Sequence, residues 1–267
     1  GFTITRCTND GPLSRGGGIL CIDSSPTIRD CIIQGNWGVH QGGGISCDHS
    51  DPVISGCQIL GNESNYGAGI WCYYSSPVIT ECSIIANIGQ DNCGGVLIGT
   101  SSNTIIQDCL IQGNVTLGGQ FGSGGGILAF QSTGGQLINC HLQGNTAASM
   151  GGGVACHEAE IFISACSIEG NTATLGGGVH SFAGTATVMG STFCSNWYLD
   201  IYGDWNDLGG NAFFEVCPVG CPADLDDDGL VGFSDLLALL ADWGCSGCSS
   251  DIDGSGYADF EDLLILL

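Results

Sequence analysis

The chain contains no lysine, and its three arginines stand against 27 acidic residues, which gives a formal net charge of −24 at pH 7. A chain this acidic repels nucleic acid, anionic membrane surfaces and polyuronate chains. It also lacks any apolar run near the roughly 20 residues that a membrane-spanning helix requires. We therefore expect no nucleic-acid partner and no membrane insertion.

The sequence is built from a repeated phrase: a glycine triplet, then Ile-x-Cys and, ten residues later, Cys-x-Ile-x-Gly-Asn. Successive copies are 26, 25, 26, 31, 27 and 25 residues apart. A short, nearly fixed period indicates one structural unit stacked on itself. The last triplet glycine of the copies is Gly18, Gly44, Gly69, Gly95, Gly126, Gly153 and Gly178.

Within each copy, small or apolar residues alternate with polar ones, as in Ile28, Cys31 and Ile33. Alternation over runs this short predicts strands. A period near 25 residues suits three short strands and three bends, which make one coil of a β-solenoid with strands about 4.8 Å apart. The closing asparagine of each copy is then expected to form a ladder from coil to coil. Its members are Asn36, Asn62, Asn87, Asn114, Asn145, Asn171 and Asn196.

The repeated phrase resembles the polymorphic-outer-membrane-protein type of right-handed parallel β-helix, and the resemblance covers roughly residues 1–215. It implies an all-β domain over residues 1–216, a solenoid of about seven to eight coils.

The chain has 17 cysteines, which suggests an oxidising, extracellular setting. Four copies carry two cysteines ten residues apart, and two interpretations stay open. Each pair forms a disulfide within its coil, or the thiols stack unbonded and fill the core as small hydrophobic groups. The pairs are Cys21/Cys31, Cys47/Cys57, Cys72/Cys82 and Cys156/Cys166.

Cys7 and Cys194 each precede an asparagine by two residues, in matching phrases, so we expect them to share one column at opposite ends of the solenoid. All three arginines, Arg6, Arg15 and Arg29, lie in the first coil and its turn, whereas 11 acidic residues fall in 217–267. Opposite charges attract. We therefore expect copies of the chain to stack head to tail into a filament, either through a Cys7–Cys194 bridge or with the acidic segment facing the arginines.

Residues 217–267 contain two acidic loops of twelve residues, each followed by a leucine-rich stretch. In both loops the oxygen ligands fall at positions 1, 3, 5, 7 and 12, with glycine at position 6, as in an EF-hand calcium loop. We therefore predict calcium as the cofactor, in two sites. The expected ligands are Asp224, Asp226, Asp228, the Leu230 carbonyl and Asp235, and then Asp251, Asp253, Ser255, the Tyr257 carbonyl and Asp262.

This tandem resembles a dockerin, which implies a small α-helical calcium module that docks to a cohesin-like partner. Two features depart from the family pattern. The second leucine-rich stretch, up to Leu267, is shorter than the first, which puts cohesin binding in doubt. Four cysteines also bracket the first loop and suggest disulfides: Cys217, Cys221, Cys245 and Cys248.

The remaining candidate residues do not converge on a catalytic site. Glu158 and Glu160 alternate on one strand at a spacing that a glycoside hydrolase pair could use, but we interpret them as solvated strand residues. The histidines form no column and are expected on the surface. They are His40, His49, His141, His157 and His180.

Aromatic residues are expected at one bend of several coils, where they would either stack on sugars or shield the bend from solvent. The set is Trp37, Tyr66, Phe121 and Trp197.

Together these features favour a secreted or cell-surface, calcium-binding scaffold of structural or adhesive type, without enzymatic activity. The alternative is a polysaccharide-binding or polysaccharide-degrading β-helix protein anchored through a dockerin–cohesin contact. Lyases of acidic sugars need Lys or Arg to neutralise the substrate carboxylate. The charge balance therefore leaves neutral glycans as the carbohydrate ligands to consider.

Overall fold

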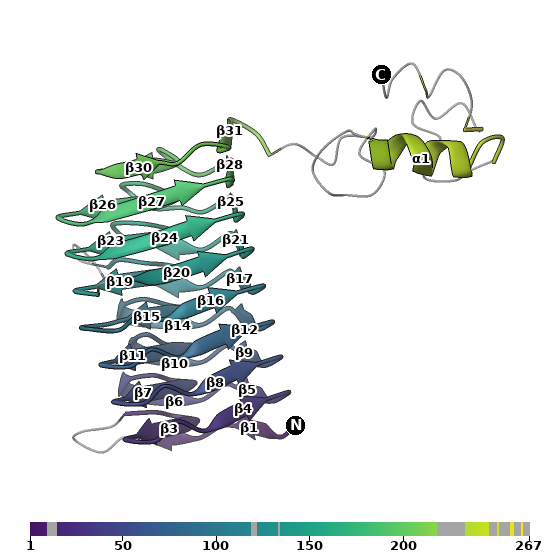
Figure 1. Cartoon of the computed structure of the whole chain (residues 1–267). Coiled ribbons are helices and arrows are strands. Elements are labelled where there is room, and N and C mark those ends of the chain that lie inside the picture. Colours follow the sequence, from purple (N-terminus) through teal and green to yellow (C-terminus); the bar gives the residue numbers. More distant parts are fainter. Residues whose placement is uncertain are drawn as a thin grey trace. The chain divides into compact units, whose positions relative to one another are not determined.

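The computed structural model describes residues 1–9, 15–118, 122–132, 134–217 and 233–245, together with residues 250, 257, 258 and 263. The chain divides into two compact units, Gly1–Cys217 and Pro218–Leu267. The first unit is a stack of parallel coils, so the predicted β-solenoid is confirmed (Figure 1). Within the described residues, no helix is both long and apolar enough to cross a membrane.

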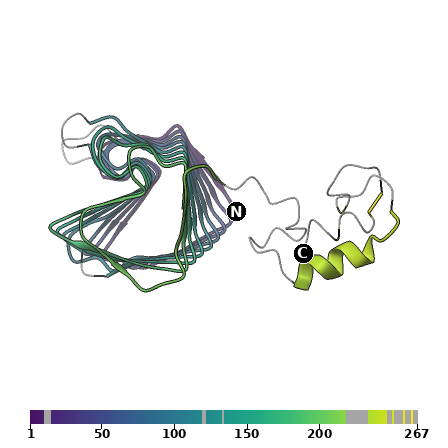
Figure 2. The same cartoon turned by 90° about the horizontal axis from the view of Figure 1, so that it is seen from above.

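The five coils between Ile19 and Ala147 pass through four strands each, one from each of four parallel sheets, A to D, whereas the three coils that follow have strands in sheets A, C and D only (Figure 2). The expectation of three strands per coil was therefore wrong for the first five of these coils and agrees with the last three. The additional sheet, B, lies between the ladder asparagine and the glycine triplet, where the sequence shows no apolar alternation. Sheets A, C and D contain nine, eight and eight strands, in agreement with the expected number of coils.

Sheet A carries the Cys-x-Ile part of the phrase and packs its isoleucines into the core. Ile33, Ile59 and Ile84 are fully buried and follow one another in register. Its strands, in spatial order, are β1 (Thr3–Thr5), β5 (Ile32–Gln34), β9 (Gln58–Leu60), β13 (Ser83–Ile85), β17 (Leu110–Gln112), β21 (His141–Gln143), β25 (Ser167–Glu169), β28 (Thr192–Cys194) and β31 (Ala212–Phe214).

Sheet B has six strands, the fewest of the four sheets. The strand that contains Ser64 and Tyr66 shifts register between these two residues against both neighbouring strands. Its strands are β2 (Thr8–Asn9), β6 (Trp37–Gln41), β10 (Glu63–Tyr66), β14 (Ile88–Asn92), β18 (Val115–Thr116) and β22 (Thr146–Ala147).

Sheet C follows the glycine triplet. A Cβ atom on Gly44 would lie 2.6 Å from the Gly69 carbonyl oxygen, so only glycine allows neighbouring coils to approach this closely here. The strands are β3 (Ile19–Ile22), β7 (Ile45–Asp48), β11 (Ile70–Tyr73), β15 (Val96–Ile98), β19 (Ile127–Phe130), β23 (Val154–His157), β26 (Val179–Phe182) and β29 (Ile201–Tyr202).

Sheet D completes each coil and leads back to sheet A through a corner in the left-handed conformation. Asp30, Gly56, Glu81 and Asp108 occupy this corner in four successive coils, with φ of 54°, 59°, 54° and 53°. The strands are β4 (Thr27–Arg29), β8 (Val53–Ser55), β12 (Val78–Thr80), β16 (Ile105–Gln107), β20 (Gly135–Ile138), β24 (Glu160–Ser164), β27 (Thr185–Met189) and β30 (Trp205–Asp207).

The predicted asparagine ladder is confirmed. The side-chain amide of Asn62 donates to the Oδ1 of Asn87 at 3.0 Å and to the Ile33 carbonyl at 2.9 Å. The backbone N–H of Asn62 donates to the same Oδ1 at 2.9 Å. The pattern recurs from Asn36 to Asn196, where the last amide donates to Asp200. The backbone N–H of every ladder asparagine from Asn36 to Asn171 therefore has a partner although it is buried.

The cysteines of the repeated phrase are unbonded, so the interpretation as disulfides within each coil was wrong. They stack from coil to coil instead, and the backbone N–H of Cys57 donates to the Sγ of Cys82 at 3.4 Å. The first cysteine of each pair, ten residues earlier, lies on a sheet C strand and belongs to a separate column. The column at the D–A corner consists of Cys31, Cys57, Cys82, Cys109, Cys140 and Cys166.

A disulfide joins Cys194, the last residue of β28, to Cys217. The predicted Cys7–Cys194 bridge between copies was therefore wrong, since Cys194 is already bonded within the chain. The two residues do not share a column either. Cys7 takes the place of a ladder asparagine and donates its N–H to Asn36, whereas Cys194 is in register with Glu169.

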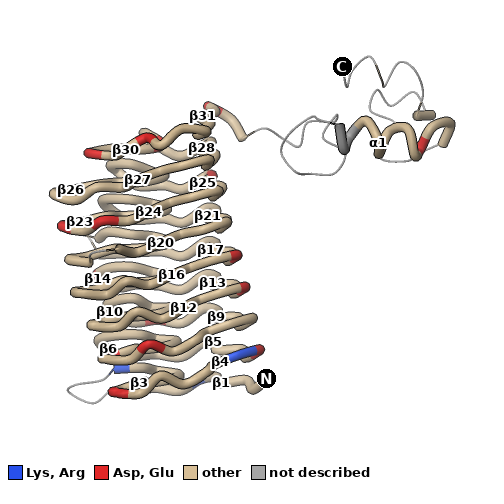
Figure 3. The backbone as a smooth tube through the Cα atoms, in the orientation of Figure 1, with Lys and Arg blue, Asp and Glu red and all other residues tan. Residues whose placement is uncertain are grey.

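Charged residues lie mainly at the corners and strand ends of the coils. Figure 3 shows arginine segments near the N-terminal end of the stack and acidic segments spread along it. In the second unit the described secondary structure is one helix, α1 (Phe233–Ala241). One short helix does not establish the expected calcium module.

Candidate functional site

The outer face of sheet C presents two columns of side chains. Because side chains alternate along a strand, Ile70 and Cys72 of β11 face the core, whereas Trp71 and Tyr73 face outward. Because the strands of sheet C pair in parallel register, the corresponding positions face outward in each coil. The first outward column is Leu20, Ser46, Trp71, Leu97, Leu128, Ala155, His180 and Tyr202, and the second includes Ile22, Asp48, Tyr73, Phe130, His157 and Phe182.

These columns form one side of a groove, and the ends of three sheet B strands form the other. Gln41, Tyr66 and Asn92 end β6, β10 and β14 and are in register with one another. The groove has a volume of about 290 Å³ and crosses several coils along the stack. It is lined by Gln41, Tyr66, Trp71, Tyr73, Asn92, Leu97, Gly99, Thr100, Leu128 and Phe130.

The floor of the groove is apolar and closely packed. Trp71, Leu97 and Leu128 are 5%, 7% and 4% exposed and pack against the buried Cys93. The ring of Tyr73 stacks on Trp71, with centroids 5.4 Å apart and an interplanar angle of 16°. Fixed rings of this kind present a rigid apolar surface to a ligand.

The rim of the groove is different, because it is exposed and carries hydrogen-bonding groups. Tyr66 and Phe130 are 37% and 40% exposed. Gln41, Asn92 and Thr100 add amide and hydroxyl groups around the apolar floor. None of the lining residues carries an ionisable acid or base that is charged at neutral pH.

Charged groups lie beside the N-terminal end of the groove but are paired with one another. The Arg15 guanidinium forms an ion pair with Asp48 and lies 5.7 Å from the centre of the Trp71 ring. Asp48 also bonds to the Nδ1 atom of His49 at 2.9 Å. This end of the groove is therefore held by a compensated set of charges rather than by a free cation.

Two histidines lie further along the same face. His157 and His180 are on adjacent strands, with ring centroids 5.5 Å apart, and His180 stacks on Tyr202. His180 is 2% exposed, and its Nδ1 atom has no hydrogen-bond partner within the described part of the chain. Burial lowers the pKa of His180 to about 4 and also lowers the pKa of His157. The prediction that all five histidines lie on the surface was therefore wrong for His180, whereas His157 is half-buried.

The sequence concealed this pair because the two residues occupy different positions of the repeated phrase. His157 follows the last triplet glycine by four residues and His180 by two. Both positions face outward on sheet C, one in each column, and adjacent columns bring the rings together.

The aromatic residues predicted at one bend do not all share it. Trp37 and Trp197 both follow a ladder asparagine, but Tyr66 ends the sheet B strand and lines the groove. Trp37 and Trp197 are exposed outside the groove lining, and Phe121 lies outside the described residues. Tyr73 and Phe130, which were not predicted from the sequence, line the groove, whereas Trp37 and Trp197 do not.

A second, more polar groove of about 470 Å³ lies on the outer face of sheet D and includes Glu160. Glu158 and Glu160 are both exposed, as expected, but only Glu160 lies on a strand, β24 (Glu160–Ser164). Glu158 lies in the bend before it with φ of 47°, so the expectation that the two alternate on one strand was wrong. Glu158 accepts a hydrogen bond from Gln131 at 3.0 Å. We assign neither carboxylate a catalytic role.

Most of the predicted calcium ligands lie outside the described residues. Two exceptions can be placed. Asp235 belongs to the first turn of α1, which begins at Phe233, and Tyr257 is exposed. The structure therefore leaves both calcium sites as predictions. The ligands outside the described residues are Asp224, Asp226, Asp228, Leu230, Asp251, Asp253, Ser255 and Asp262.

Comparison with known families identifies one match. Residues 1–147, more than half of the 267-residue chain, match a family model described as a right-handed beta helix region. No curated protein matches the sequence.

Proposed function

This chain belongs to the right-handed β-helix family, and on that premise we propose that it is an extracellular, non-catalytic scaffold that binds a neutral glycan in the sheet C groove. The proposal unites the adhesive scaffold with the polysaccharide-binding alternative that the sequence had left open. It concerns binding alone, and a degrading activity is a separate outcome that its test would reveal.

The observation that carries the proposal is the lining of the groove. Tyr66, Tyr73 and Phe130 offer ring surfaces on which the C–H face of a sugar can pack. Gln41, Asn92 and Thr100 lie near them and can bond sugar hydroxyls. An apolar floor with a few polar groups around it is the usual composition of a small-ligand site.

The class of glycan follows from charge. The lining residues carry no free cation that could neutralise a sugar carboxylate, and Arg15, the nearest arginine, is paired with Asp48. The chain as a whole carries a net charge of −24 and repels polyanions. A neutral oligosaccharide avoids this repulsion.

The test is binding of the full chain to an array of neutral and acidic glycans, followed by calorimetry on the best ligand. Replacement of Tyr66 or Phe130 by alanine should weaken binding at least about tenfold, because loss of a stacked ring costs on the order of 1.5 kcal/mol or more. Phe182→Ala is the matched control, since Phe182 is exposed on the same face but outside the groove.

Two results would contradict this function. One is binding to no neutral glycan, and the other is binding that Tyr66→Ala and Phe130→Ala leave unchanged. Release of shorter sugars from a neutral polysaccharide would instead favour the degrading alternative.

For the second unit we propose two calcium sites formed by the acidic loops, on the basis of their ligand spacing. Eleven acidic residues in 217–267 repel one another without metal, so calcium should be needed for this unit to fold. Calorimetry of the full chain in chelator should show this unit melting separately and earlier than the solenoid. An identical melting profile with calcium and with chelator would rule the sites out.

Docking to a cohesin-like partner and head-to-tail association are the two assembly modes that we propose for this scaffold. The second no longer includes a disulfide between copies. Light scattering of the full chain in calcium, at increasing concentration, measures self-association directly. A constant monomer mass would leave docking to another protein as the remaining mode.

A further inference from the structure

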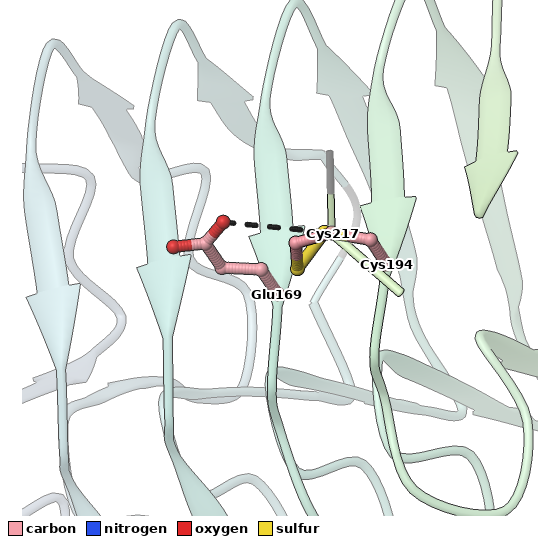
Figure 4. A group of neighbouring side chains, drawn as sticks. All are labelled: Glu169, Cys194 and Cys217. Atoms are coloured by element: carbon pink, nitrogen blue, oxygen red, sulfur yellow. Dashed lines mark hydrogen bonds between the residues drawn. A yellow bond between two sulfur atoms is a disulfide. The ribbon is translucent and has the colours of Figure 1, made fainter. Parts of the chain in front are cut away.

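Three side chains with metal-binding atoms, Glu169, Cys194 and Cys217, converge on the outer face of sheet A at the last coils of the solenoid (Figure 4), and His141 contacts Glu169 from a neighbouring strand. They are unrelated to the sheet C groove and to the acidic loops. Glu169 ends β25 and is in register with Cys194, the last residue of β28. Cys217 covers Cys194 from the segment that follows β31, and His141 begins β21, two strands before β28 in sheet A.

The distances place Glu169, Cys194 and Cys217 in one cluster, with His141 joined to it through the Glu169 carboxylate. Ligand atoms of Glu169, Cys194 and Cys217 all lie within 4.8 Å of one another. The Sγ of Cys194 is 4.0 Å from the Oε2 of Glu169, and the other carboxylate oxygen, Oε1, is 2.6 Å from the Nε2 of His141. The cluster is reachable from solvent, because the side chains of Glu169 and His141 are 20% and 43% exposed.

Two sulfurs, one imidazole nitrogen and one carboxylate oxygen make a ligand set that suits Zn²⁺. Zinc holds such ligands tetrahedrally at about 2.0–2.3 Å, which separates neighbouring ligand atoms by about 3.4–3.8 Å. The 4.0 Å between the Cys194 Sγ and the Glu169 Oε2 is close to that range, whereas the 2.6 Å between the Glu169 Oε1 and the His141 Nε2 is a hydrogen-bond distance that must lengthen when both atoms bind one ion. The main change needed is separation of the two sulfurs, and Cys217 follows exposed residues beyond the end of β31.

The two sulfurs are bonded to each other in this structure, and a disulfide does not offer thiolates to a metal. A dithiol reductant changes this by exchange. It gives two electrons and two protons to the Cys194–Cys217 bond, which becomes two thiols, and the reductant becomes a disulfide. A divalent cation that binds both sulfurs then displaces the two thiol protons into solvent.

We propose that the reduced chain binds one Zn²⁺ ion through His141, Glu169, Cys194 and Cys217. Disulfide and zinc are then two alternative links between Cys217 and the solenoid. The last coil, which lies between the two cysteines in sequence, stays attached under oxidising conditions through the disulfide and under reducing conditions through the metal. This proposal does not depend on glycan binding.

The other solenoid thiols do not form a comparable cluster. Within the described residues, Glu169, Cys194 and Cys217 are the one group of three or more metal-binding side chains whose ligand atoms all lie within 4.8 Å of one another. Cys57 and Cys82, for example, are buried and donate to backbone carbonyls of their own and neighbouring coils.

The experiment uses the full chain, reduced by a dithiol under inert gas and freed of reductant by gel filtration. Zn²⁺ is titrated against a chromophoric chelator, with excess calcium present to occupy the acidic loops. The reduced chain should bind one more zinc ion than the Cys194→Ser/Cys217→Ser variant, which retains every other cysteine. Co²⁺ in place of Zn²⁺ should give thiolate-to-cobalt absorption that the double variant lacks.

Single substitutions test the remaining ligands without removing a thiol. Glu169→Gln and His141→Gln should each weaken zinc binding at least about tenfold. His40→Gln and Glu158→Gln are controls at sites distant from the cluster in the chain and should have no effect. The proposal is overturned if the reduced wild type binds no more zinc than the double variant. It is equally overturned if Glu169→Gln and His141→Gln both bind zinc as tightly as the wild type.

Discussion

The asparagine column and the cysteine column both accept backbone N–H groups at a corner of the coil, but with different side-chain chemistry. In both, a side chain of one coil accepts the backbone N–H of the coil before it, as Asn87 does for Asn62 and Cys82 does for Cys57. The asparagine amide also donates to the next asparagine, so its side chains form a continuous chain of bonds. A thiol bonds more weakly and donates only to carbonyls.

The two columns differ in whether another residue type can occupy a position in them. The position after Cys166 in its column is occupied by Ser191, whose hydroxyl accepts the Cys166 N–H at 3.1 Å. The asparagine column has no such substitute between Asn36 and Asn196. A corner that needs one acceptor therefore accepts Cys or Ser, whereas a corner that needs an acceptor and two donors requires Asn.

The largest effect is expected from Asn87→Ala. The substitution removes the acceptor of two buried donors on Asn62 and leaves a cavity, which should lower the free energy of unfolding by about 2–4 kcal/mol. Denaturant unfolding of the solenoid measures it. Asn206→Ala, at an exposed position, should stay within about 0.5 kcal/mol of the wild type. Equal losses in the two variants would mean that the ladder has no special role.

A smaller effect is expected in the cysteine column. Two substitutions at Cys82, one without a hydrogen-bond acceptor and one with, measure how much the acceptor contributes to stability. Cys82→Val keeps an apolar side chain, with one more branch than cysteine, but leaves the Cys57 N–H without an acceptor, at a cost of about 1–2 kcal/mol. Cys82→Ser keeps an acceptor, as Ser191 does, and should cost less than Cys82→Val. The same unfolding assay ranks the two, and a serine variant less stable than the valine variant would show that packing dominates this column.

The smallest effect is expected at His180, a buried residue whose Nδ1 atom has no hydrogen-bond partner in the described part of the chain. His180 has a lower pKa in the folded chain than in the unfolded chain, so the unfolded state binds more protons between about pH 6.5 and pH 4. Stability should therefore fall as the pH falls through this window. His180→Phe keeps the stack on Tyr202 and removes the partnerless nitrogen.

Between pH 7.5 and pH 5.5, the free energy of unfolding should fall by about 1 kcal/mol less in the variant than in the wild type, as measured by denaturant unfolding at each pH. Taking the difference between variant and wild type removes the contribution of the carboxylates. Parallel stability curves for the two proteins would show that protonation of His180 does not oppose folding.

Much of the solenoid could be predicted from the sequence because its physical constraints repeat. Asn36 to Asn196 recur with the coil, and every member adds to the same signal. The strand count was missed because sheet B consists of residues such as Glu63–Tyr66 that show no apolar alternation. The Cys194–Cys217 bond was also missed, because Cys217 lies outside the repeat and nothing in the spacing shows where it returns to the solenoid.

The groove was harder to predict than the coils that form it. Whether Trp71 and Tyr73 face the core or solvent depends on the phase of the strand, which the pattern Ile-x-Cys does indicate. The position of Phe130 beside them depends on the 31-residue step between coils, which brings Ala129 into register with Ile98. Contacts between coils, rather than spacing within one, therefore determine the site.

The step of 31 residues has a consequence for the history of the chain. The longer connection lies between β18 and β19, and the pairs Val96–Ile127, Ile106–Leu137 and Ile111–Leu142 continue in register beyond it. An insertion at this corner thus leaves every neighbouring coil with its partners. By the same logic, duplication or deletion of one whole repeat in the gene joins two surfaces that already match. The length of the stack is therefore a quantity that evolution can change one coil at a time.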